Sequence, residues 1–186
     1  TGIKEFLYDF HERNGEMMKK DSGRILSNIK IAKDVYRMEI RTSIADEVKC
    51  GQFVQVEIPG MFLRRPISVS ERIGDTIVLI YKTVGEGTAV MSAMKEGEAI
   101  SLFGPLGNGF PLRNEDVVLI GGGVGVPPLV ETAKAYLEMG QKVTAVLGFN
   151  TEHDMILKDR MESLGIRTCI ATMDGSYGTK GTVMDA

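Results

Sequence analysis

The sequence predicts a small antiparallel β-barrel followed by the first half of a doubly wound parallel sheet. Between residues 23 and 111, apolar side chains recur at every second position in short segments separated by tight turns, as in an antiparallel barrel. After residue 111 the pattern changes to apolar runs that alternate with helical periodicity, which is typical of βαβ units. We therefore divide the chain into an N-terminal appendage (1–22), a barrel (23–111) and an incomplete α/β domain (112–186).

The appendage carries one helical signal. Apolar residues at helical spacing predict a short amphipathic helix that Asn14-Gly15 ends. A helix that docks on a partner is the functional alternative to a plain extension of the chain. The residues that carry the signal are Ile3, Phe6, Leu7 and Phe10.

Short strands are predicted throughout the barrel region. Residues 35–41 alternate most clearly between apolar and polar side chains. Gly74-Asp75 separates two β-rich segments and is a hairpin signal. One short helix, roughly Thr88 to Met94, interrupts the strands. The expected strands span residues 25–32, 35–41, 53–58, 67–70, 76–81 and 99–103.

The α/β region begins with a strand and a helix. Residues 117–120 form a continuous apolar run, which predicts a strand buried on both faces. The helix that follows has Pro127 or Pro128 in its first turn, where a missing N–H does no harm, and it ends at Gly140.

A second strand and helix and a third strand complete the predicted half-sheet. Residues 142–147 form the second strand, and Thr151 with an acid three residues later resembles the start of a helix that continues to Gly165. The third strand covers residues 166–171. The order β-α-β-α-β is the first half of a doubly wound sheet.

Composition excludes several classes of protein. Of the 186 residues, 43% are hydrophobic and 25% charged, and the net charge is −3. These values predict a packed soluble core and argue against nucleic acid as a partner. No apolar stretch is long enough to span a membrane, and no signal peptide is recognised, so a cytoplasmic location is expected. Cys50 and Cys169 lie far apart, which favours neither a disulfide framework nor a metal site.

The first candidate cofactor site is Arg65-Pro66-Ile67-Ser68. Arg is a permanent cation that can bind two phosphate oxygens, and Pro fixes the backbone. A small hydroxyl such as that of Ser68 suits the N5 edge of a flavin ring. For this tetrapeptide alone, a strand with a surface Arg is the more common explanation.

The second candidate is Gly85-Glu86-Gly87-Thr88, where a strand leads through a glycine turn into a helix. Backbone N–H groups at a helix N-terminus favour a phosphate, and glycine lets the phosphate approach. An ordinary turn with a Thr cap is equally consistent with this segment alone. Arg65 nearby in sequence favours the phosphate.

The third candidate is the glycine-rich run from Gly121 to Pro128, between the first buried strand and its helix. Val126 stands where a third fingerprint glycine would fall, so the run is not an ordinary dehydrogenase motif. Its glycines exceed what packing requires, which favours a dinucleotide lying across them. Residues 174–178 follow the third strand at the same sheet edge, where a ligand contact and a flexible turn are about equally plausible.

In this order and spacing, the motifs resemble the ferredoxin reductase superfamily, and within it the electron-transfer subunits of dihydroorotate dehydrogenase B. The resemblance covers the chain from about residue 22 onward. The segments that carry it span residues 65–68, 85–88, 104–110, 121–128 and 174–181.

The resemblance implies that FAD binds the barrel and that NADH delivers hydride to flavin N5. Ser68 would be the catalytic residue. The residues expected to bind FAD are Arg65, Pro66, Ile67, Ser68, Ile80, Tyr81, Lys82, Gly87 and Thr88. Those expected to bind NADH are Gly121, Gly122, Gly123, Gly125 and Pro127.

The resemblance also implies a partner. In the family, a [2Fe-2S] cluster held by four cysteines passes electrons to FMN in a catalytic subunit that oxidises dihydroorotate in pyrimidine synthesis, and a heterotetramer is expected. Cys50 and Cys169 cannot replace those four cysteines, so no bound metal is expected here. No nucleic-acid or membrane partner is expected.

Two alternatives remain open at this point. One is the flavin subunit of another NAD(P)H-linked reductase, of the hydrogenase, sulfide reductase or ferredoxin:NADP oxidoreductase type. The other is a non-catalytic nucleotide-binding module.

Overall fold

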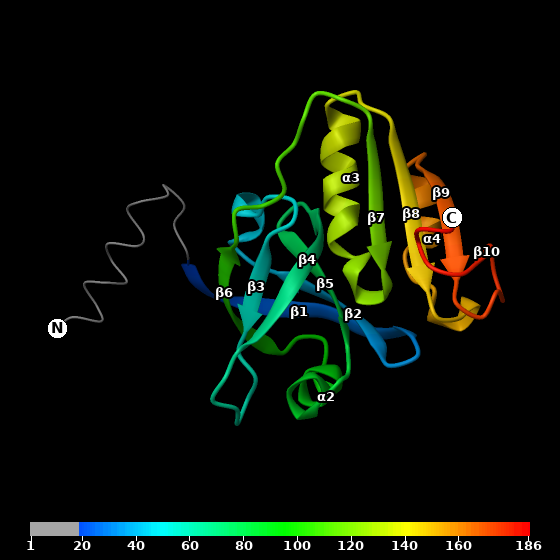
Figure 1. Ribbon diagram of the computed structural model, residues 1–186. Coiled ribbons are helices and arrows are strands. Elements are labelled where there is room, and N and C mark those ends of the chain that lie inside the picture. The colour runs from blue at the N-terminus through cyan, green and yellow to red at the C-terminus, as the bar shows by residue number, and fades with distance from the viewer. Residues whose placement is uncertain (1–18) are drawn as a thin grey trace, which may run out of the picture.

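The computed structural model describes residues 19–186 as a barrel followed by a parallel sheet (Figure 1). The helix expected within residues 3–10 lies outside the described residues. The first strand, β1 (Lys19–Ala32), starts inside the stretch that the sequence assigned to the appendage. Residues 19–24 of this strand pair with the last barrel strand, so they belong to the barrel.

The barrel is closed by six antiparallel strands in the order β1-β2-β5-β4-β3-β6. Its interior is filled by apolar side chains such as Met38, Leu79 and Leu102, none of which is exposed. One 3₁₀ turn, η1 (Ala45–Glu47), and one helix, α2 (Glu86–Ala93), interrupt the strands. The remaining strands are β2 (Val35–Arg41), β3 (Phe53–Val56), β4 (Arg65–Ile73), β5 (Thr76–Lys82) and β6 (Ala99–Leu106).

The alternation predicted for residues 25–32 holds only at its start. Ile25 is fully buried, but Ile29 is 53% exposed. The register between β1 and β2 shifts after Ile25 and again after Lys30. Each shift moves the following side chains relative to the two faces, so sequence spacing no longer reports burial.

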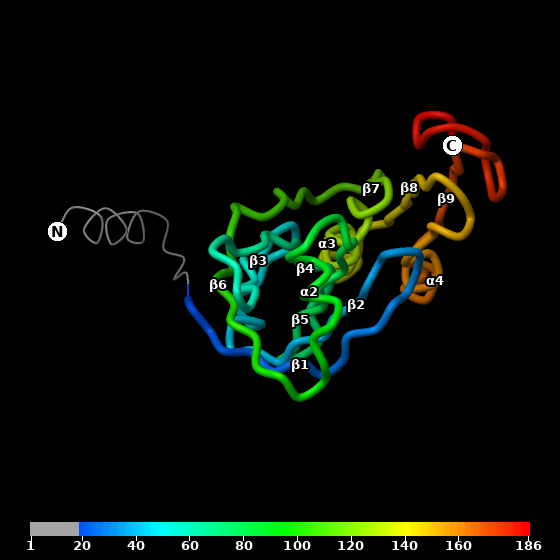
Figure 2. Tube along the Cα trace, turned by 90° about the horizontal axis from the view of Figure 1, so that it is seen from below, coloured from blue at the N-terminus to red at the C-terminus, as the bar shows by residue number. Residues whose placement is uncertain are grey.

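The second domain is a parallel sheet in the order β10-β9-β8-β7. The glycine-rich run forms a 3₁₀ turn, η2 (Gly123–Gly125), between β7 and α3. Helices α3 and α4 lie on the side of the sheet that faces the barrel (Figure 2). The elements are β7 (Val117–Gly122), α3 (Pro128–Glu138), β8 (Val143–Phe149), α4 (Lys158–Ser163), β9 (Arg167–Thr172) and β10 (Thr179–Lys180).

The prediction that residues 117–120 are buried on both faces is wrong for the described chain. Val118 is 58% exposed and Ile120 is 52% exposed, whereas Leu119 is buried. Both crossovers run in the same direction along the sheet, so right-handed connections place both helices on one face. The described residues leave the other face of β7 uncovered.

The prediction of one continuous helix from Thr151 to Gly165 is also wrong. This segment consists of a 3₁₀ turn, η3 (Glu152–Asp154), and the separate helix α4. Leu157 between them has a φ of 64°, in the left-handed region, where a right-handed helix cannot continue. The Thr151 hydroxyl donates to the Asp154 carboxylate at 3.0 Å instead of capping a backbone N–H.

An apolar interface joins the two domains. Val35, Val78 and Ile80 lie on the outside of the barrel and belong to the same buried cluster as Leu129 and Ile156 of the α/β domain. Helix α3 lies between the sheet and the barrel, where it packs against β4 (Figure 1). The glycine-rich run at the start of α3 is therefore held close to the barrel.

Candidate functional site

Arg65 and Gly87, which are distant in sequence, are in direct contact. A Cβ added to Gly87 would lie 2.4 Å from the Arg65 Nε. Only a glycine therefore lets the guanidinium lie against the first turn of α2. The Arg65 Nη1 donates to the Leu63 carbonyl at 2.7 Å, and among residues 19–186 no carboxylate pairs with this cation. An unpaired cation over a helix N-terminus is the arrangement that a phosphate group fits.

Helix α2 begins two residues before the predicted Thr88. Gly85 is the N-cap in an extended conformation, and Glu86 is the first helical residue. The Thr88 hydroxyl accepts the Val84 N–H at 3.0 Å and donates to the Gly85 carbonyl at 3.0 Å. This bonding fixes the turn before the helix, at the terminus where backbone N–H groups favour an anion.

Asn28 fixes the other end of α2. Its Nδ2 donates to the carbonyls of Met91 and Met94, at 3.0 and 2.9 Å. Its Oδ1 accepts the Tyr81 hydroxyl at 2.9 Å. Burial raises the pKa of Tyr81 to about 12, so the phenol stays protonated and donates at neutral pH. Sequence reasoning missed this role, because an Asn in a strand has no distinctive pattern.

Replacing Asn28 with Ala should loosen α2. The change leaves two helix carbonyls and one buried hydroxyl without their partner, which costs about 1–3 kcal/mol for a buried group. Thermal unfolding should show the loss, and FAD affinity should fall with it if α2 binds the FAD phosphates as predicted. Asn114→Ala is the control, since the Asn114 side chain is exposed and, within residues 19–186, accepts a hydrogen bond only from Gln141. Equal unfolding temperatures for Asn28→Ala and Asn114→Ala would contradict this role.

The glycine-rich run has two kinds of glycine. A Cβ on Gly121 would lie 2.7 Å from the Leu129 Cδ1 and 3.2 Å from the Gly125 carbonyl oxygen, so this glycine is required by packing. A Cβ on Gly123 or Gly125 would meet nothing within 4 Å. Pro127 is the N-cap of α3 and Pro128 its first residue. The last glycines of the run therefore border open space, as a bound dinucleotide requires.

A pocket of about 460 Å³ lies at the carboxyl end of the sheet strands. Gly122, Gly123 and Val124 line it from the glycine-rich run, and Lys82 lines it from the barrel. Open α/β sheets bind ligands at this edge. The pocket therefore joins the end of the predicted flavin strand to the predicted NADH run. Phe149 and Met173, which also line it, were not predicted.

The other predicted residues are placed as follows. Tyr81 lies inside the barrel, stacked on Tyr36 at 5.8 Å between ring centroids, so its side chain faces away from the pocket. Ile80 lies in the apolar interface between the domains. Pro66 is exposed, and Ile67 and Ser68 are half-buried on β4. Within residues 19–186, the Ser68 hydroxyl has no hydrogen-bond partner.

Residues 174–178 form a tight turn of their own. The Asp174 carboxylate accepts the Ser176 hydroxyl at 2.6 Å and the Ser176 N–H at 3.0 Å. These bonds lower the pKa of Asp174. The Ser176 Oγ in turn accepts the Glu152 N–H at 2.8 Å, which ties the turn to the start of η3. These local hydrogen bonds explain the conformation of residues 174–178.

Comparisons with known proteins agree with this arrangement. The family model for the oxidoreductase NAD-binding domain matches residues 119–172. The dihydroorotate dehydrogenase B electron transfer subunit of Fusobacterium nucleatum is 40% identical over 178 residues, which are 90% of this chain and 68% of the relative. The subunit of a Geobacillus strain is 40% identical over 179 residues, or 91% of this chain and 69% of the relative.

The chain belongs to the family of dihydroorotate dehydrogenase B electron transfer subunits. It spans about two thirds of the length of these relatives. A solved NADH-dependent reduced ferredoxin-NADP oxidoreductase, studied for flavin-based electron bifurcation, is 35% identical with a TM-score of 0.81. The match covers 88% of this chain and 60% of that chain. That solved structure and this chain therefore share the barrel followed by an α/β domain.

FAD and NAD(H) fit the residues present, whereas an iron–sulfur cluster does not. The unpaired Arg65 over α2 and the open glycines of the run each leave room for a phosphate. Cys50 lies in the barrel and Cys169 in the sheet, both as free thiols, so this stretch of chain cannot supply four thiolates.

No helix in residues 19–186 is long and apolar enough to cross a membrane.

Proposed function

We propose that the chain takes electrons from NADH through FAD and passes them to the dihydroorotate-oxidising subunit of dihydroorotate dehydrogenase B, in pyrimidine biosynthesis. The observation that carries this proposal is a pair of candidate nucleotide sites, one on each side of the end of β5. Arg65 lies against Gly87 of α2, and Lys82, the last residue of β5, lines the pocket that Gly122 and Gly123 also line. A bound flavin accepts two electrons from a nicotinamide and can release them singly.

We propose the following roles for individual residues. Arg65, Gly87 and Thr88 hold the FAD phosphates, and Ser68 offers its hydroxyl to the flavin ring as the catalytic contact. Pro66, Ile67, Ile80, Tyr81 and Lys82 shape the strands that the cofactor follows, although Tyr81 does so only through its backbone. The NADH site comprises Gly121, Gly122, Gly123, Gly125 and Pro127.

We further propose two domains, a FAD-binding barrel ending near residue 111 and an NAD-binding domain after it. The partner would be the catalytic subunit that the relatives' name implies, assembled as a heterotetramer. A cytoplasmic location fits the two free cysteines, because thiols persist in reducing compartments.

The purified chain should be yellow and should bleach when NADH is added without oxygen. FAD gives the colour, and loss of absorbance near the flavin maximum reports its reduction. A colourless chain that takes up no added FAD would contradict the proposal. A yellow chain that NADH does not bleach would support a binding module only.

A second candidate is the flavin subunit of another NAD(P)H-linked reductase. The similarity to the NADH-dependent reduced ferredoxin-NADP oxidoreductase favours it, at 35% identity. A reoxidation experiment separates the two candidates. The chain is reduced and then mixed either with a dihydroorotate dehydrogenase catalytic subunit or with a ferredoxin. Only the correct acceptor should reoxidise the flavin rapidly.

A further inference from the structure

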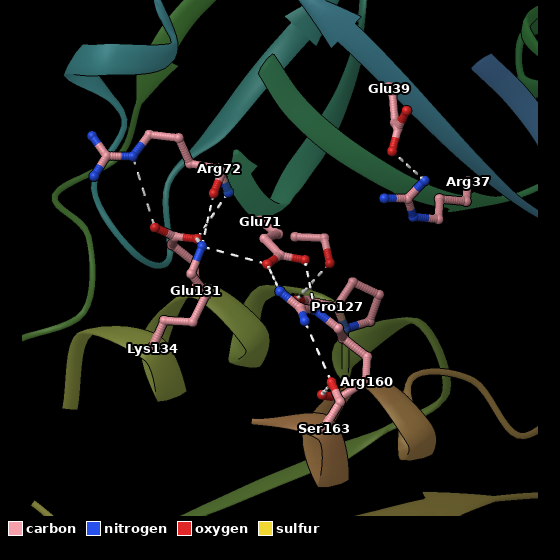
Figure 3. Close-up of polar contacts among 10 residues, drawn as sticks. Arg37, Glu39, Glu71, Arg72, Pro127, Glu131, Lys134, Arg160 and Ser163 are labelled. Atoms are coloured by element: carbon pink, nitrogen blue, oxygen red, sulfur yellow. Dashed lines mark hydrogen bonds and ion pairs between the residues drawn. The ribbon is translucent and has the colours of Figure 1, made fainter. Parts of the chain in front are cut away.

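A cluster of five charged side chains joins the two domains (Figure 3). Two come from β4 of the barrel, two from α3, and one from α4. We call it the interdomain ion cluster; its members are Glu71, Arg72, Glu131, Lys134 and Arg160.

Glu71 is the centre of the cluster. Its side chain is 6% exposed, and the Arg160 guanidinium meets both carboxylate oxygens, with Nε at 3.1 Å from Oε2 and Nη2 bonded to Oε1. Lys134 adds a second cation, with Nζ 3.4 Å from Oε1. Burial raises the pKa of Glu71, but Arg160 and Lys134 outweigh it and leave the pKa below its usual value. The carboxylate is therefore ionised at neutral pH.

Three further bonds tie β4 to α3 through backbone groups. The Glu131 Oε2 accepts the Arg72 N–H at 2.8 Å, and the Lys134 Nζ donates to the Arg72 carbonyl at 2.7 Å. The Ser70 hydroxyl donates to the carbonyl of Pro127, the N-cap of α3, at 3.1 Å. Backbone groups cannot change rotamer, so these bonds hold β4 beside α3, and the Glu71–Arg160 pair adds a second attachment, from β4 to α4.

The cluster lies on the same two elements that carry the proposed cofactor sites. Strand β4 begins with residues 65–68 and continues directly into Ser70, Glu71 and Arg72. Helix α3 begins directly after the glycine-rich run and carries Glu131 and Lys134 in its first two turns. A rotation of one domain against the other would therefore move the two sites relative to each other.

We propose that Glu71 and Arg160 are positioning residues that set the relative placement of the flavin and nicotinamide sites for hydride transfer. The proposal rests on the proposed function. The apolar interface around Val78 and Ile80 is non-directional and holds the domains together without fixing an angle. A two-point contact between a guanidinium and a carboxylate is directional, and it sets the angle.

The test compares Glu71→Gln and Arg160→Gln with the wild-type chain loaded with FAD. Stopped-flow absorbance gives the rate constant of flavin reduction at saturating NADH, and titrations give the affinities for FAD and NADH. We expect the rate constant to fall about 10- to 100-fold, the scale of an error of about 1 Å in placement. Affinities should change less than about twofold, because neither side chain touches a cofactor motif.

Glu162→Gln is the matched control. Glu162 pairs with Lys158 inside α4 and with Thr168 of the neighbouring strand, so its contacts stay within one domain. Its reduction rate should match the wild type. Equal rates for all four proteins, or an equal loss in Glu162→Gln, would overturn the proposal. Arg160 is 39% exposed, so Arg160→Gln keeps the test available if Glu71→Gln fails to fold.

Hydrogen exchange supplies a readout that needs no NADH. Peptides covering residues 69–73 and 127–134 should exchange faster in Glu71→Gln and Arg160→Gln than in Glu162→Gln. If NADH fails to reduce the wild type, the proposed function is lost, and unchanged exchange then also overturns the positioning role. Faster exchange in that case supports the role of the cluster in fixing the domains.

Discussion

The Kd for FAD should be about 10- to 150-fold higher in an Arg65→Ala variant than in the wild type. The variant loses a charge-assisted hydrogen bond to phosphate, worth about 1.5–3 kcal/mol. The Arg65 guanidinium already lies against Gly87 without a carboxylate partner, so its loss leaves no other described charge unpaired. Fluorescence titration of the apoprotein with FAD measures the change.

Arg64→Ala is the control for this prediction. Arg64 bonds to Glu57 and to the Ser101 hydroxyl on the barrel wall, away from Gly87. Gly87→Ala should mimic Arg65→Ala although the arginine remains, because the new methyl would displace the guanidinium. Equal FAD affinity for Arg65→Ala and the wild type would remove the phosphate role.

The second large effect concerns the glycine-rich run, where stability and NADH binding should separate. Gly121→Ala pushes a methyl against Leu129 and the Gly125 carbonyl oxygen, at 2.7 and 3.2 Å. Such overpacking costs about 1–3 kcal/mol. The unfolding midpoint in urea should fall, and NADH binding should weaken because the run must shift.

Gly125→Ala should weaken NADH binding without a loss of stability. Its methyl meets no protein atom within 4 Å, so stability should stay within about 0.5 kcal/mol of the wild type. If NADH lies across the run, that methyl occupies ligand space and the KM for NADH should rise about tenfold or more. An unchanged KM in Gly125→Ala would place the nicotinamide nucleotide elsewhere.

Local sequence determined much of the fold. Residues 35–41 alternate cleanly and form β2 as predicted, because one face packs in the barrel and the other does not. Gly74-Asp75 forms the predicted hairpin turn between β4 and β5, with Gly74 at a φ of 57°. The change of period after residue 111 marked the parallel sheet, because strands and crossover helices follow different repeats.

Local patterns failed where a distant contact decided the outcome. The residues from Thr151 to Gly165 have helical spacing, but Leu157 takes a left-handed conformation between the buried Ile156 and α4. Residues 117–120 look like a doubly buried strand, yet their burial depends on which helices cover the sheet. Neither fact is visible within the segment itself.

The sequence by itself determined the kinds of element, their order and the three glycine or arginine motifs, because these follow from backbone preferences and side-chain chemistry over a few residues. Only the tertiary structure decided that the Arg65 guanidinium rests on Gly87 and that Asn28 holds the far end of α2. It also decided that Glu71 ties β4 of the barrel to Arg160 on α4. These contacts join residues far apart in the chain, and their geometry is set by how the barrel and the sheet pack together.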